Sequence, residues 1–91
     1  MNPTWRMEPR AGVVAQVVDG EAVLVQPDRR MVSVLNPVAA RIWELADGRR
    51  TLAEIAALIC EEFMVEPAQA QADVLEFAGL LQSKGLVKLC E

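Results

Sequence analysis

The segment from Leu35 to Ile55, which reads LNPVAARIWELADGRRTLAEI, constrains the fold more than any other part of this chain. Asn36–Pro37 opens a helix, because Asn caps well and Pro suits the first helical position, where its missing N–H would be unpaired anyway. Asp47–Gly48 ends that helix, and Thr51 with Glu54 three residues later forms a capping box for a second one. A strand end and two helices are therefore encoded in one short stretch that contains no His and no Cys.

Three strands are predicted up to the start of the first helix. Val13–Val18 and Glu21–Gln26 are apolar runs joined by Asp19–Gly20. This dipeptide is a strong hairpin signal, because a type I′ turn needs positive φ at both central residues. Pro27–Arg30 predicts a second turn and Met31–Leu35 a third strand. The three strands make a small antiparallel meander.

The remainder of the chain predicts a third helix. Glu66–Pro67 opens it and Lys84–Gly85 closes it, and Leu86–Leu89 is either a short last strand or an extended tail. Residues 1–10 predict a flexible N-terminal arm, and residues 11–91 a single folded domain. The expected fold class is α+β and winged-helix-like, with a three-stranded antiparallel β-meander followed by three α-helices.

Composition bounds the function. The chain has 91 residues, a hydrophobic content of 53% and a formal net charge of -4, which argues against a nucleic-acid footprint built from clustered basic residues. Cys60 and Cys90 are the two cysteines, there is no CxxC spacing and no His, so neither a metal site nor a cofactor is expected. With no signal peptide and no apolar run long enough to span a bilayer, we expect no membrane association and a cytoplasmic location.

The sequence also predicts that the protein is not an enzyme. Ser33 and Ser83 have no His to activate them. Asp73 and Glu76 lie one helical turn apart, but acids at this spacing usually form a solvated helix face. We therefore expect no catalytic residues.

The third strand and the third helix are the elements that favour binding. Met31–Leu35 is an outer strand with neither Pro nor Lys inside it, so its free edge is open to an extended peptide by β-addition. Asp73, Phe77 and Leu80 lie on one flank of the third helix and would form a wall beside that edge. From the sequence alone, Phe77 and Leu80 fit the hydrophobic core equally well.

Three segments together resemble the PqqD-like family: the stretch of residues 35–55 quoted above, ADVLEF at 72–77 and KGLV at 84–87. The resemblance covers residues 13–88. It implies a peptide chaperone, also called a RiPP recognition element, which binds the leader segment of a ribosomally made precursor peptide. Such a domain presents the precursor to a modifying enzyme, which is a radical SAM protein in the synthesis of pyrroloquinoline quinone (PQQ).

The resemblance also implies a binding site. In this family the leader adds as a strand to the third strand and rests against the third helix. The corresponding residues here are Met31, Val32, Ser33, Val34, Asp73, Phe77 and Leu80. Pro27–Arg29 matches the family's turn only in part, and position 80 is apolar where many relatives carry a charge. A PQQ, lasso-peptide or thioether-peptide pathway therefore stays open.

Two alternatives belong to other classes. A winged-helix DNA-binding regulator could place Arg29–Arg30 and Arg49–Arg50 on phosphates, although its third helix would carry Glu66, Asp73 and Glu76 toward DNA. A small interaction subunit could instead form a homodimer through the free strand edge.

Overall fold

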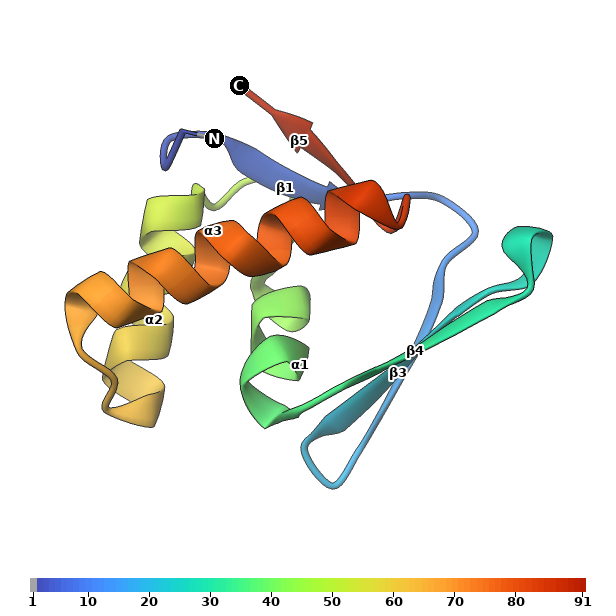
Figure 1. Ribbon diagram of the computed structural model, residues 1–91, viewed down its shortest axis with the longest axis horizontal. Helices are drawn as coiled ribbons and strands as arrows, with labels where there is room; N and C mark the ends of the chain where they lie inside the picture. The colour runs from blue at the N-terminus through green and yellow to red at the C-terminus, as the bar shows by residue number, and fades with distance from the viewer. Residues whose placement is uncertain (1) are drawn as a thin grey trace.

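The computed structural model describes residues 2–91 and contains two antiparallel sheets and three α-helices (Figure 1). The elements are β1 (Arg6–Pro9), β2 (Val14–Val18), β3 (Glu21–Gln26), the 3-10 turn η1 (Pro27–Arg29), β4 (Met31–Leu35), α1 (Pro37–Leu45), α2 (Leu52–Phe63), α3 (Pro67–Ser83) and β5 (Val87–Cys90). The larger sheet has the strand order β2-β3-β4, and β1 pairs with β5. The predicted α+β fold, a meander followed by three helices, is confirmed.

The predicted hairpin turn is present between β2 and β3. Asp19 has a φ of 52° and Gly20 a φ of 80°, the positive values that a type I′ turn requires. This turn fixes the register, in which Val18 pairs with Glu21 and Val14 with Val25. β3 also pairs with β4, from Ala22 with Leu35 to Gln26 with Met31. β3 is therefore paired on both sides, and β2 and β4 are the edge strands of this sheet.

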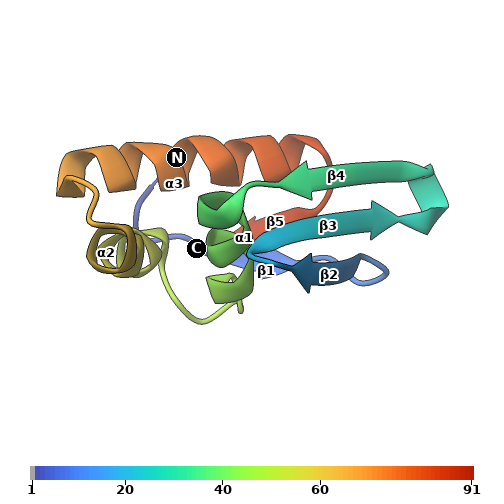
Figure 2. The same ribbon diagram turned by 90° about the horizontal axis from the view of Figure 1, so that it is seen from below.

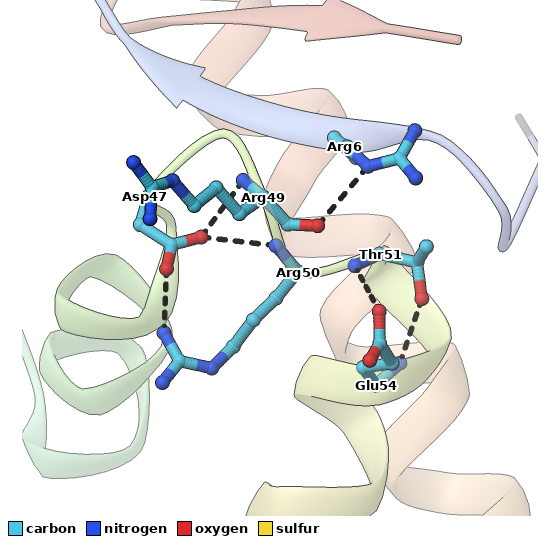
Figure 3. Close-up of polar contacts among 6 residues, drawn as sticks. All are labelled: Arg6, Asp47, Arg49, Arg50, Thr51 and Glu54. Carbon is cyan, nitrogen blue, oxygen red and sulfur yellow. Dashed lines mark hydrogen bonds and ion pairs between the residues drawn. The ribbon is translucent and has the colours of Figure 1, made fainter.

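Side-chain caps fix the start of α1 and of α2. The Asn36 side-chain oxygen accepts a hydrogen bond from the Ala39 N–H at 2.9 Å. In the capping box of α2, the Thr51 N–H donates to the Glu54 carboxylate at 2.9 Å, and the Glu54 N–H donates to the Thr51 hydroxyl at 3.1 Å (Figure 3). The first of these bonds is the main reason that the pKa of Glu54 lies below its ordinary value.

Asp47 organises the connection between α1 and α2. Its carboxylate accepts hydrogen bonds from the Arg50 N–H at 3.0 Å and the Arg49 N–H at 2.9 Å, and it pairs with the Arg50 guanidinium at 2.7 Å (Figure 3). These backbone donors, Arg50 first, lower the pKa of Asp47. The Arg6 guanidinium donates to the Arg49 carbonyl at 3.0 Å and so attaches β1 to the same connection.

The hydrophobic core lies between the helices and one face of the larger sheet. Ala22 and Leu24 of β3 and Leu35 of β4 are buried on the face that contacts α1. α2 packs on both α1 and α3, and α3 also packs on β5 (Figures 1 and 2). We call this covered side of the β2-β3-β4 sheet the inner face. No helix within residues 2–91 has both the length and the apolarity needed to cross a membrane.

The N-terminal segment differs from the expected flexible arm over residues 6–9. These residues form β1, which is antiparallel to β5, and Met7 is fully buried. The Leu52 N–H donates to the Trp5 carbonyl at 2.8 Å and the Gly48 N–H to the Met7 carbonyl at 3.0 Å. Pro9 is the last residue of β1, where a missing N–H does not interrupt the pairing. The C-terminal residues accordingly form a strand, which the sequence had left open.

We expect that Met7→Ala lowers the free energy of unfolding by roughly 2–5 kcal/mol, the usual cost of truncating a buried Met. Glu8→Ala is the matched control, because Glu8 is the exposed neighbour on the same strand. Urea denaturation followed by circular dichroism measures both variants. Equal stability of Met7→Ala and the unaltered protein would mean that β1 does not belong to the cooperative unit.

Candidate functional site

A groove lies between α1 and α3, beside the end of β4. Its volume is about 760 Å³, which makes it the largest of the pockets described for residues 2–91. The residues that line it are Asn36, Val38, Ala39, Ile42, Asp73, Glu76, Phe77, Gly79, Leu80 and Ser83. It therefore brings together the three helical residues predicted from the sequence, Asp73, Phe77 and Leu80.

The apolar residues of α3 that pack or line the groove form two stripes along the helix. Ala70, Val74, Ala78 and Leu81 are buried in the core. Phe77 is half-buried and Leu80 is 48% exposed, and both line the groove on the adjoining flank. Of the two interpretations that the sequence left open, the structure assigns Leu80 to the groove, while Phe77 contacts both the core and the groove.

The opposite wall comes from α1, and sequence reasoning missed it. Val38 and Ala39 form the first turn of the helix and stay partly exposed, and Ile42 lies one turn further along. Their helical spacing indicates an apolar face of α1 but not which neighbour that face meets. The signal that would have found them is the Asn36–Pro37 junction, because a helix that starts directly after an edge strand leaves its first turn beside that edge.

The four predicted residues of β4 lie beside the groove rather than in its lining. Ser33 is buried and Met31 half-buried on the inner face, whereas the Val32 and Val34 side chains are exposed on the opposite face. One side of β4 pairs with β3, and the other has no partner strand among residues 2–91. In strand addition these residues would therefore act through their backbone N–H and C=O groups.

Electrostatically the groove is acidic. Asp73 and Glu76 contribute carboxylates, Asn36 and Ser83 contribute neutral polar groups, and no Lys or Arg is among the lining residues. Asp73 accepts a hydrogen bond from the Gln69 side chain at 2.7 Å, which fixes its position on the helix. Arg41 of α1 instead pairs with Glu62 of α2 at 2.8 Å, and this hydrogen bond raises the Arg41 pKa.

An open strand edge beside an apolar groove defines a small docking domain for an extended segment. The family model described as "Coenzyme PQQ synthesis protein D (PqqD)" matches residues 21–87. The PqqA binding protein of Xanthomonas oryzae pv. oryzae strain PXO99A is 38% identical over 82 residues, which cover 88% of this chain and 87% of the relative. The PqqA binding protein of Xanthomonas axonopodis pv. citri strain 306 is equally similar. The chain belongs to the PqqD family.

Solved structures agree with this assignment. TbiB1 in complex with the TbiA(beta) leader peptide matches with a TM-score of 0.81 and 28% identity, covering 89% of this chain and 94% of that one. The solution structure of the PqqD part of Methylobacterium extorquens PqqCD, described as a stand-alone RiPP recognition element, matches with a TM-score of 0.69 and 28% identity. It covers 97% of this chain and 99% of that one.

Two neighbouring leucines of α3 lie in different environments: Leu80 lines the groove and Leu81 is buried in the core. We expect Leu80→Asp to change the free energy of unfolding by less than about 1 kcal/mol, because the new carboxylate reaches water. Leu81, which is 1% exposed, is the matched control: Leu81→Asp should destabilise the domain by roughly 3–5 kcal/mol, because it buries an unpaired charge. Thermal and urea unfolding measure both, and equal losses would place Leu80 in the core.

Proposed function

We propose that this protein binds the leader segment of a ribosomally made, PqqA-like precursor peptide and presents the precursor to the enzyme that modifies it, a radical SAM protein. The observation that carries the proposal is the free edge of β4 beside the groove between α1 and α3. The peptide-binding relatives and the leader complex of a similar fold support it.

The two parts of the site have different roles. An extended peptide that pairs with β4 forms backbone hydrogen bonds, which set its register and tolerate many sequences. Every second side chain of such a peptide points to the same side of the sheet. Apolar leader residues on the side of α3 would enter the groove against Phe77 and Leu80, and this contact supplies the selectivity for a particular leader.

The acidic groove separates this function from DNA binding. Asp73 and Glu76 would repel phosphates, whereas a peptide with apolar side chains meets Val38, Ala39 and Leu80. A leader with a basic residue near its apolar anchors would fit better than an acidic one. Dimerisation through β4 remains a prediction, and it would compete with the peptide for the same edge.

The test uses the PqqA peptide of Xanthomonas oryzae and isothermal titration calorimetry. We expect Leu80→Asp to weaken binding by roughly 1–3 kcal/mol, the transfer free energy of one apolar side chain, which corresponds to about fivefold to 150-fold in Kd. Met64→Asp is the matched control, because Met64 is an apolar residue that is 93% exposed and lies outside the groove.

Normal binding by a folded Leu80→Asp variant would refute the groove as the leader site. Salt dependence tests the DNA alternative, since a peptide held mainly by backbone bonds and apolar contacts should lose far less affinity between 50 and 200 mM salt than a DNA complex would. A sequence-specific DNA complex that weakens steeply over the same range would favour the regulator.

A further inference from the structure

The side of the β2-β3-β4 sheet that faces away from α1 carries six valines. The strand register places them on one surface, since directly paired residues point to the same side of a sheet. They are Val14 and Val18 of β2, Val23 and Val25 of β3, and Val32 and Val34 of β4. We call this surface the valine face. The four on the edge strands are each between 54% and 66% exposed.

No helix or strand within residues 2–91 covers the valine face. In Figure 2, which looks onto the sheet from below, α1 and α2 lie beyond one end of the strands, α3 runs along the β4 side, and no helix lies in front of the sheet. The largest contiguous apolar patch on a small domain is often an interaction site. Apart from the valines, the paired positions of this face hold Gln16 and Glu21 and no basic residue. A phosphate backbone or an anionic lipid surface would need Lys or Arg here, so the chemistry fits an apolar protein surface.

The size of the face argues against a second copy of this chain as the occupant. Three strands about 4.8 Å apart, with five residues at about 3.4 Å each, span roughly 250 Å² of sheet. A stable interface needs about 800 Å² from each partner. Two valine faces packed together would fall well short of that area. A transient complex with another protein needs less buried area and can also use surfaces outside the valine face.

The valine face is continuous with the proposed leader site. β4 supplies both Val32 and Val34 to the face and the free edge for the leader. A leader strand added to β4 would extend the sheet by one strand, and every second leader side chain would join the valine face. The resulting surface is larger than that of the empty domain and exists only in the loaded state.

We propose that the valine face is the docking surface for the enzyme that modifies the precursor, and that this enzyme contacts the face and the added leader strand together. The inference rests on the proposed function. By linkage, an enzyme that binds the combined surface favours domains that carry a leader, and the leader in turn binds more tightly when the enzyme is present. The domain thereby distinguishes loaded from empty copies without any conformational change.

The test compares two double variants of β2, each of which places two positive charges on a different face of the sheet. Val14→Lys with Val18→Lys alters the valine face on β2, away from the leader edge. Ala15→Lys with Val17→Lys is the matched control, because these exposed residues lie on the same strand and point to the other side. Lys is well tolerated on an edge strand, so both proteins should fold, which circular dichroism verifies.

Each variant replaces the protein in the organism that produces it, and mass spectrometry quantifies the modified precursor. We expect Val14→Lys/Val18→Lys to lower the product at least tenfold, while its Kd for the Xanthomonas oryzae PqqA peptide changes less than twofold. The control pair should leave both quantities unchanged.

Unchanged product from the Val14→Lys/Val18→Lys protein would overturn the inference, and so would an equal loss in the control pair or a parallel loss of peptide affinity. Leu80→Asp, tested beside them, reports on the leader site alone. Unchanged product from Leu80→Asp would contradict the proposed function itself, whatever the two lysine pairs do.

Discussion

The hydrogen bonds between the Gln26 side chain and the end of α3 attach the β2-β3-β4 sheet to that helix. The Gln26 amide donates to the carbonyl oxygens of Lys84 and Gly85, at 3.3 Å each, and the residue is 6% exposed. Arg29 donates to the Lys84 carbonyl at 3.4 Å. Gly85, with a φ of 73°, leaves the space that the Arg29 guanidinium occupies. Because β3 pairs with β4, this contact also ties the strand with the free edge to α3.

The junction between β4 and α1 completes the arrangement at the other end of the strand. Asn36 caps α1 immediately after β4 ends, so Val38 and Ala39 stand beside the strand edge. The groove is therefore formed by the strand that leads into one helix and by the exposed flank of another. None of this requires a catalytic group, which agrees with the peptide-binding family to which the chain belongs. Under the proposed function, the free edge and the apolar wall together hold an extended chain for another protein.

Local signals in the sequence predicted most of the fold, because each turn and cap depends on a few neighbouring residues. Asp19–Gly20, Asn36–Pro37 and the Thr51–Glu54 box all lie where they were predicted. The pairing of β1 with β5 was missed, since it joins the two ends of the chain and has no local signature. The role of Val38 on the groove wall was missed for a related reason: helical periodicity identifies an apolar side chain but not which neighbour it meets. The site residues of α3 followed from their shared flank of the helix and from the family resemblance, and their use by a peptide remains a prediction.

Amide hydrogen exchange with and without a saturating leader peptide tests the central claim, that β4 accepts the leader as an additional strand. The larger sheet offers its own control, because β2 is the other free edge of the same three strands. We predict slower exchange for those β4 amides that point away from β3, on alternate residues of Met31–Leu35, and unchanged exchange along β2. Protection along β2, or none along β4 while the peptide is bound, would contradict the account.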